Sequence, residues 1–481
     1  MQATPVLNIL GLLLALLACT MLIPMGIDLY YDDPNWQAFA VAALMTGFIG
    51  GSLWLANRQK NTADLGLKEA FLLTNGAWVF IALFGALPLY FSSLSLSVED
   101  AFFESMSGIT TTGSTILPSI EAASRGVLIW RALLQWLGGV GIIVMALAVL
   151  PMLSVGGMQL FKTESFDAAD KVIPRATQLA GGIFAVYTGL TLFWTFMLTL
   201  AGMPGFDALA HAMTTLATGG YSTKTASIGA FDSQTIELII IAGMITGSLP
   251  FVHYLSLTRG GWKALSADPQ VRWFILLTML VIAAITFNLY QNGEGWASAL
   301  RLSAFNSVSV ITGTGYGSAN FALWGSSATT ILLICMFIGG CAGSTTCGIK
   351  MFRLQVLAAT IKVQLARLLR PHAVVLAYYN KRPVSENVMD AVMGFFYLYI
   401  LCFVVLALLL GMFGLDFETA LSGAATSISN VGPGLGNVIG PSGDFSSLPA
   451  AAKWVMCFGM LLGRLELFTV LVILNPVFWR R

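Results

Sequence analysis

Apolar residues along this chain gather in long runs that short polar stretches separate. A helix needs about 20 apolar residues to cross a bilayer, and in lipid only helices and closed barrels satisfy their own backbone groups. The sequence lacks the alternating pattern of a membrane barrel. The runs therefore predict an all-α polytopic membrane protein. The expected spans are residues 5–27, 36–56, 71–92, 128–152, 180–202, 235–256, 273–291, 329–349, 391–413 and 453–475.

The outer loops after the first two spans resemble one another. They read DAFFESMSGITTTGST, DALAHAMTTLATGGYS, LSAFNSVSVITGTGYG and LSGAATSISNVGPGLG, aligned on Gly113, Gly220, Gly315 and Gly434. Each copy lies between two spans, so the unit is a span, a short amphipathic helix, a loop rich in Thr and Gly, and a second span. Repeats of one topology arrange around an axis normal to the membrane. We predict two extra N-terminal spans within 1–66 and four pseudo-symmetric repeats around a central pore, within 67–155, 178–258, 270–370 and 388–481.

The loop chemistry suits a dehydrated cation. Backbone carbonyls replace the water shell in K⁺ filters, glycine permits the backbone angles that align them, and the negative end of each short helix favours a cation. The alternative is close helix packing through small residues. The candidate filter residues are Thr111, Thr112, Gly113, Thr218, Gly219, Gly220, Thr312, Gly313, Thr314, Gly315, Val431, Gly432, Pro433 and Gly434.

Composition agrees with a membrane protein, since the chain is 57% hydrophobic and 10% charged, against about 25% charged in soluble domains. The net charge of +1 indicates no nucleic-acid partner. Cys341 and Cys347 have no His or acid beside them, so no metal site is expected. The first apolar run has no basic residues before it and is too long for a signal peptide, so we expect it to remain as a span.

Basic residues set the expected orientation, because cytoplasmic loops are rich in Lys and Arg. One side holds 18 of the 24 basic residues, namely Arg58, Lys60, Lys68, Lys162, Lys171, Arg175, Arg259, Lys263, Arg272, Lys350, Arg353, Lys362, Arg367, Arg370, Lys381, Arg382, Arg480 and Arg481. The other side holds Arg125, Arg131, Lys224, Arg301 and Lys453. Both termini are therefore expected in the cytoplasm. The outer loops are acidic, which predicts either a cation-concentrating mouth or ordinary solvated loops.

A second irregular segment, residues 339–348, interrupts the eighth span. Four glycines close together should break a helix, and the segment is polar. We expect either a gate below the filter or a kinked helix. Arg464 lies inside the last span, where a charge is costly, and we expect it to donate to carbonyls of this segment or to snorkel inward. The candidate gate residues are Gly339, Gly340, Gly343, Ser344, Thr345, Thr346, Gly348 and Arg464.

The motifs TTTGST, ATGGYS, TGTGYG, NVGPGLG and IGGCAGSTTCGIKMFR resemble those of the bacterial Trk/Ktr/HKT superfamily of K⁺ transporters, and the extra N-terminal spans resemble its TrkH/TrkG/TrkI branch. The resemblance covers essentially the whole chain. It implies K⁺ uptake across the bacterial inner membrane, a homodimer and a cytosolic nucleotide-binding regulator of the TrkA type. K⁺ is then the transported ion, no tightly bound cofactor is expected, and nucleotide acts only through the partner.

In plant relatives a serine at the first filter glycine accompanies Na⁺ preference. Gly113 therefore implies K⁺, and we expect Gly113→Ser to weaken K⁺ discrimination with the fold intact. Val431 and Pro433 depart from the threonine-rich pattern and make the expected filter asymmetric.

Other classes of protein fit less well. An inverted-repeat transporter needs repeats of opposite topology, an intramembrane hydrolase needs a paired nucleophile and base, and a structural scaffold leaves the four loops unexplained. We therefore expect no enzyme activity. Passive conduction and coupled symport both remain open. The basic stretch 350–390 is expected to contact a cytosolic partner or anionic membrane lipids.

Overall fold

The computed structural model describes residues 3–58, 66–148, 176–257, 261 and 263–480. Within these ranges the chain is almost entirely helical, and the strands β1 (Tyr378–Tyr379) and β2 (Arg382–Pro383) form one antiparallel pair. The predicted end of the first repeat near residue 155 lies outside the described residues. The same holds for the expected cytoplasmic basic residues Lys60, Lys162, Lys171, Arg175, Arg259 and Arg481.

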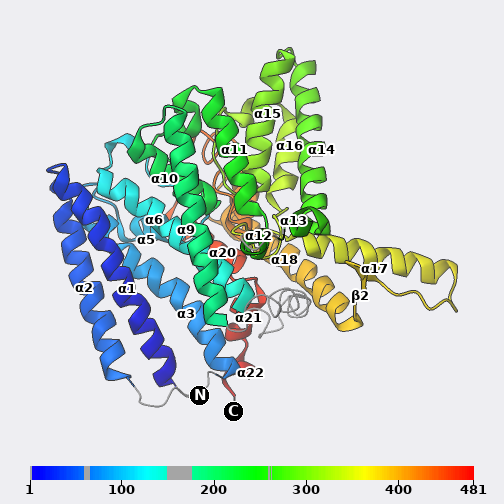
Figure 1. The fold of residues 1–481 in the computed structure, drawn as a ribbon, viewed down its shortest axis with the longest axis horizontal. Coiled ribbons are helices and arrows are strands. Elements are labelled where there is room, and N and C mark those ends of the chain that lie inside the picture. Colours follow the sequence, from blue (N-terminus) through cyan, green and yellow to red (C-terminus); the bar gives the residue numbers. More distant parts are fainter. Residues whose placement is uncertain (1–2, 59–65, 149–175, 258–260, 262, 481) are drawn as a thin grey trace.

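The two N-terminal spans form a hairpin of α1 (Ala3–Tyr30) and α2 (Trp36–Ala56) at one side of the molecule (Figure 1). Their backbones approach closely at Gly50, where a Cβ would lie 2.7 Å from the backbone nitrogen of Ala15. The buried carboxylate of Asp28 joins this hairpin to the rest of the protein. It accepts hydrogen bonds from the backbone N–H of Gly126 at 2.6 Å and from the Ser124 hydroxyl at 3.0 Å.

A long helix, a short buried helix and a second apolar helix then occur in this order four times, and each set includes one further helix. The first set is α3 (Leu67–Gly85), α4 (Leu87–Phe91), α5 (Val98–Ile109) and α6 (Arg125–Ala148). The second is α9 (Ala176–Leu200), α10 (Gly205–Leu216), α11 (Gln234–Ser248) and α12 (Phe251–Leu257). The third is α14 (Pro269–Gln291), α15 (Trp296–Ile311), α16 (Ser326–Met336) and α17 (Met351–Leu369). The fourth is α18 (Glu386–Met412), α19 (Phe417–Ser429), α20 (Ala450–Arg464) and α21 (Phe468–Leu474).

Shorter elements connect these sets. They are η1 (Ile120–Ala122), η2 (Ser227–Phe231), α13 (Lys263–Ala267), η3 (Phe321–Leu323) and α22 (Pro476–Trp479). Polar caps begin two of the short buried helices, since Ser97 accepts from the backbone N–H of Asp100 before α5 and Asp416 accepts from that of Thr419 before α19. These bonds satisfy N–H groups that have no partner inside a helix. The hydrogen bonds from Thr419 also hold the pKa of the Asp416 carboxyl below its ordinary value.

Among the described residues, seven helices are long and apolar enough to cross a membrane, and two further spans are bent pairs of helices. The predicted spans 235–256 and 453–475 therefore each consist of two helices with a sharp bend between them. The first breaks between α11 and α12 with a bend of 99°, because Pro250 lacks an N–H and disfavours helical backbone before it. The second breaks between α20 and α21 with a bend of 117°, and Glu466 and Leu467 have positive φ angles of 62° and 38°.

Helix α16 is a short apolar helix that ends at Met336, where the irregular segment begins. The chain then continues as α17, which extends away from the helical body (Figure 1). The two chain ends lie near each other at one end of the molecule, and the turn between α14 and α15 lies at the opposite end (Figure 1).

Candidate functional site

The four short helices α5, α10, α15 and α19 end in loops that start in the same way. In each loop one backbone N–H donates to the carbonyl of the residue five positions earlier. The donors are Thr112, Gly219 and Thr314, each at 2.9 Å, and Val431, at 3.1 Å. The preceding residue is left-handed in every loop. The φ angles are 53° at Thr111, 50° at Thr218, 68° at Gly313 and 52° at Asn430.

The next glycine of each loop packs on the neighbouring loop. These glycines also have positive φ, and a Cβ on any of them would meet a backbone carbonyl oxygen of another repeat. The pairs are Gly113 with Gly219, Gly220 with Thr314, Gly315 with Val431, and Gly432 with Thr112. The four contacts close into a ring in the order of the repeats. Only glycine fits such positions, because both the backbone angle and the space exclude a side chain.

The ring corrects the sequence alignment of the fourth loop. Gly432 occupies the position of Gly113, Gly220 and Gly315, whereas the alignment had placed Gly434 there. Gly434 lies off the ring, where its N–H donates to the carbonyl of Ile439 at 2.6 Å. Packing of the second span of the repeat also supports Gly432 as the equivalent of Gly113. A Cβ on Gly463 would meet the carbonyl of Ile428, four residues before Gly432. Gly138 meets Ile109 in the same way, four residues before Gly113.

The expected effect of Gly113→Ser also changes. Gly113 has a φ of 88°, and any Cβ there would overlap the Gly219 carbonyl oxygen. A serine therefore requires the adjacent backbone to move. The structure therefore adds a local shift of the loop backbone to the expected effect of this substitution on K⁺ discrimination.

All four ring glycines line one cavity of about 70 Å³ on the side of the connecting loops. Its basic lining residues are Arg131 and Lys224, and no carboxylate occurs among the described residues that line it. Glu104, one of the carboxylates expected on the outer side, is instead fully buried and accepts a hydrogen bond from Arg131 at 2.7 Å. The negative mouth suggested by the acidic loops is therefore absent from the lining of this cavity.

Hydroxyl groups hold the loops from behind. In the first and third loops two threonines bond to each other at 2.7 Å, Thr110 with Thr112 and Thr312 with Thr314. Other hydroxyls join different repeats. Ser114 donates to the carbonyl of Gly432 at 2.7 Å, and the Tyr221 hydroxyl donates to the carbonyl of Glu104 at 2.7 Å. Neutral hydrogen bonds within and between repeats thus support the ring, and the Arg131–Glu104 pair holds the residues just beyond it, because Arg131 donates to the Ser222 carbonyl at 3.1 Å and Glu104 accepts from the N–H of Ile116 at 2.9 Å.

The segment 339–348 is buried, and the break between α11 and α12 holds it. The backbone N–H groups of Cys341 and Thr345 donate to the carbonyls of Ser248 and Gly247 at 3.0 and 3.1 Å, and Phe251 donates back to Gly343 at 3.0 Å. These carbonyls are available because the helix stops there. The predicted irregular, protein-buried segment is therefore present.

Thr345 places this segment directly beside the second of the four loops. Its hydroxyl donates to the carbonyl of Leu216 at 3.0 Å and accepts from the Thr218 hydroxyl at 3.2 Å. Thr218 is one of the left-handed loop residues. The segment therefore adjoins the second loop on the side where α10 ends.

Arg464 makes the expected contact with the segment. Its guanidinium donates to the carbonyl of Thr345 at 3.0 Å, to Sγ of Cys347 at 2.7 Å and to the carbonyl of Gly138 at 2.8 Å. The side chain is 1% exposed, so it does not snorkel to the surface. Glu466 pairs with Arg353 at the start of α17.

Sequence reasoning missed further residues that hold the segment. The Gln270 side chain accepts from the backbone N–H of Ala342 at 3.0 Å, and the buried Lys350 ammonium donates to the carbonyl of Thr346. Pro250, which breaks α11 from α12, was the available signal for the carbonyls of Gly247 and Ser248. Gln270 lies just before the predicted span 273–291, and nothing in its position suggested a role.

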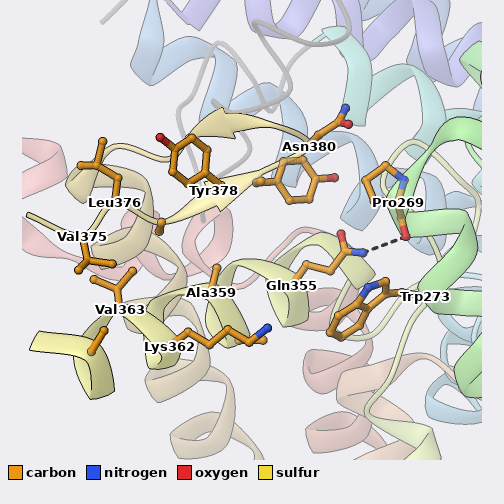
Figure 2. Close-up of a pocket in the computed structure, with 14 residues that line it drawn as sticks. Pro269, Trp273, Gln355, Ala359, Lys362, Val363, Val375, Leu376, Tyr378 and Asn380 are labelled. Carbon is orange, nitrogen blue, oxygen red and sulfur yellow. Dashed lines mark hydrogen bonds between the residues drawn. The ribbon is translucent and has the colours of Figure 1, made fainter. Parts of the chain in front are cut away.

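The basic stretch 350–390 contains α17 and the β1–β2 hairpin. A groove of about 550 Å³ lies between them and the start of α14 (Figure 2). Its lining includes Trp273, Lys362, Val363 and Tyr378, and Gln355 donates across it to the carbonyl of Pro269 at 2.9 Å (Figure 2). The apolar lining with a basic side chain belongs to the surface expected to contact a partner or lipid.

The fold and this site define a polytopic membrane protein with a four-loop ring beside an irregular buried segment. The family model of TrkH, described as a cation transport protein, matches residues 35–479. The chain belongs to this family, whose members are ion transporters and not enzymes.

Curated relatives match over the whole length. The Trk system potassium uptake protein TrkI of Halomonas elongata is 44% identical, with 99% of this chain and 97% of the relative covered. TrkH of Escherichia coli K12 is 39% identical, with 98% of each covered. The crystal structure of the potassium transporter TrkH from Vibrio parahaemolyticus superposes with a TM-score of 0.91 at 36% identity, covering 100% of both chains.

Proposed function

We propose that this protein takes up K⁺ across the bacterial inner membrane through a selectivity filter formed by the four loops. The closed ring of Gly113, Gly220, Gly315 and Gly432 carries the proposal, because it brings four strands together around one cavity. Backbone carbonyls in such strands can replace the hydration shell of K⁺. The names of the relatives as potassium uptake proteins support the choice of ion.

The filter comprises the loop residues around this ring. It includes Thr111, Thr112, Thr218, Gly219, Thr312, Gly313, Thr314 and Val431 in addition to the ring glycines. Asn430 joins the set because its left-handed backbone matches that of Thr111. Gly434 leaves it, and Pro433 lines the outer cavity.

The gate in this proposal is segment 339–348, with Arg464 as its latch. Three observations support it. The segment is buried, it lies against the second filter loop through Thr345, and Arg464 from another repeat holds it. A charge-assisted hydrogen bond contributes about 1.5–3 kcal/mol, so a partner that moves α17 could release the segment.

The partner in this proposal is a cytosolic nucleotide-binding subunit of the TrkA type, and the protein acts as a homodimer. The surface of α17 and the β1–β2 hairpin is the proposed contact region for the regulator. Its basic residues and its groove (Figure 2) suit a soluble acidic surface and neighbouring lipid headgroups. The protein itself then needs no bound cofactor besides the K⁺ that it transports.

The orientation is tested by labelling. Asn292 is exposed at the turn between α14 and α15, which should face the periplasm. A cysteine there, in a background without native cysteines, should react with an impermeant thiol reagent added to intact spheroplasts. Labelling only after lysis would reverse the proposed topology.

Uptake is tested with purified protein in liposomes. A K⁺ gradient should drive Rb⁺ into vesicles that contain the protein, and an equal Na⁺ gradient should drive much less Na⁺. Equal movement of both ions, or movement no faster than in empty vesicles, would contradict the proposal.

A further inference from the structure

The second filter loop lacks the brace that the first and third loops share. Those two loops carry threonines at the positions of Thr110 and Thr112, and the hydroxyls bond to each other. The second loop has Ala217 and Gly219 at the matching positions. It therefore has no hydroxyl of its own at either place.

A side chain from the preceding repeat fills this space. Gln135 of α6 is fully buried, and its amide N–H donates to the carbonyl of Gly219 at 2.6 Å. Its amide oxygen accepts from the backbone N–H of Tyr221 at 3.0 Å. The two bonds hold the strand on both sides of Gly220. The Gly219 carbonyl is also the one on which Gly113 packs in the ring.

The side chain of Gln135 occupies the space that a side chain at position 219 would need. Gly219 is absent from the positive-φ positions, so its backbone angle permits other residues. A Cβ there would nevertheless lie 2.5 Å from the amide oxygen of Gln135 and 2.8 Å from its nitrogen. The glutamine and a threonine side chain are therefore alternative ways to support the strand.

We propose that Gln135 is a positioning residue for the filter, which fixes the Gly219 carbonyl and thereby contributes to discrimination between K⁺ and Na⁺. The inference rests on the proposed function of the four loops. Without the glutamine, a strand with no side chain at Gly219 can shift, and a ring that adapts to a smaller ion loses its preference for the larger one.

The first test is Gln135→Met, which keeps the length of the side chain and removes both hydrogen bonds. The K⁺ to Na⁺ permeability ratio, measured from reversal potentials in vesicles, should fall about tenfold, since two neutral hydrogen bonds are lost. Trp136→Phe, at the neighbouring residue of α6, removes a hydrogen bond to Thr191 away from the four loops and should leave the ratio unchanged. A ratio within about twofold of the parent for Gln135→Met would overturn the inference.

The second test exchanges one brace for the other. Gly219→Thr alone should lower the ratio, because the new side chain collides with Gln135. The triple variant Gln135→Ala, Ala217→Thr, Gly219→Thr rebuilds the pair of hydroxyls found in the first and third loops and should recover the ratio. This variant also decides the matter if Gln135→Met fails to assemble, since a folded triple variant with a low ratio overturns the inference.

Measurements on the parent protein distinguish a failure of the role of Gln135 from a failure of the proposed filter. Selective parent vesicles with an unchanged Gln135→Met ratio would reject only the role of Gln135. Parent vesicles without K⁺ preference would reject the filter itself.

Discussion

The four loops proposed as a filter and segment 339–348, proposed as a gate, are both irregular, buried and rich in Gly, Ser and Thr, yet the structure holds them in different ways. The filter has four copies that pack on one another, and its hydrogen bonds join neutral groups such as Ser114 and the Gly432 carbonyl. The gate segment occurs once and is held by cations, Arg464 and Lys350, and by carbonyls of a broken helix. The same residue types thus make a fixed ring in one place and a separable contact in the other.

Charged side chains bond to segment 339–348 itself, whereas at the four loops the Arg131–Glu104 pair bonds only to residues beyond the ring glycines, such as Ile116 and Ser222. Leaving a buried guanidinium without its acceptor costs more free energy than leaving a neutral group unpaired. A small number of hydrogen bonds from Arg464 therefore decides whether segment 339–348 stays in its closed position. The ring instead distributes its stability over contacts between all four repeats. Substitutions should therefore affect selectivity in one region and opening in the other.

The largest effect is expected at the ring. Gly220→Ala places a Cβ against the Thr314 carbonyl at a residue with a φ of 76°. Backbone strain of about 1–3 kcal/mol adds to this collision, so Rb⁺ uptake into vesicles should fall by about two orders of magnitude. Gly205→Ala, in the same repeat with open space around it, should leave uptake unchanged. Parent-level uptake by Gly220→Ala would place the ring off the conduction path.

The next effect concerns the gate. Arg464→Ala removes the donors to Thr345, Cys347 and Gly138. Each charge-assisted bond is worth about 1.5–3 kcal/mol, so the loss should raise Rb⁺ uptake without any regulator by at least about tenfold. The K⁺ to Na⁺ ratio should stay constant. Arg301→Ala, which removes the outer ion pair with Glu237, serves as the control. A folded Arg464→Ala protein that conducts no faster than the parent would show that segment 339–348 is a kinked helix and not a gate.

The register of the fourth loop gives a sharper comparison within the filter. Gly432→Ala introduces strain at a φ of 109° and a contact of 2.9 Å with the Thr112 carbonyl, so the K⁺ to Na⁺ ratio should fall about tenfold. Gly434→Ala meets only flexible side-chain atoms of Ile439 and Ser422 at its closest contacts. A K⁺ to Na⁺ ratio that changes in Gly434→Ala and not in Gly432→Ala would show that Gly434 is the equivalent of Gly113, as the sequence alignment predicts.

The smallest effect is expected for one hydroxyl brace. Thr312→Val keeps the shape of the side chain and removes its bond to Thr314. A single neutral hydrogen bond is worth about 1 kcal/mol, so the ratio should fall about threefold to fivefold. Thr330→Val, at an exposed threonine of α16, is the matched control. An equal drop in both variants would trace the effect to stability in general.

The sequence was informative where local chemistry decides the structure. The spans and short helices follow from apolar runs, and the contact of Arg464 with segment 339–348 follows from the need of a buried charge for acceptors. The fourth loop offers two glycines, Gly432 and Gly434, and only packing against Thr112 selects between them. The break at Glu466 has no proline or glycine at the bend, and Glu466 pairs there with Arg353, which is distant in sequence.

Gln135 illustrates a signal that was present but unused. A polar residue in the apolar run 128–152 needs a partner, yet the partner lies on the next repeat, and the sequence gives no distance between them. Pro250 likewise signalled a bend inside span 235–256. Residues whose role depends on contacts between repeats were the ones that sequence patterns left unassigned.

The separation of filter and gate is tested most directly by one measurement, the K⁺ to Na⁺ permeability ratio of regulator-free vesicles that contain Arg464→Ala. The proposed mechanism predicts faster Rb⁺ uptake than the parent with the parent's ratio, because the ring of Gly113, Gly220, Gly315 and Gly432 is untouched. Faster uptake with the ratio lost would show that the segment held by Arg464 is itself part of the selective site, and would contradict the assignment of selectivity and opening to different regions.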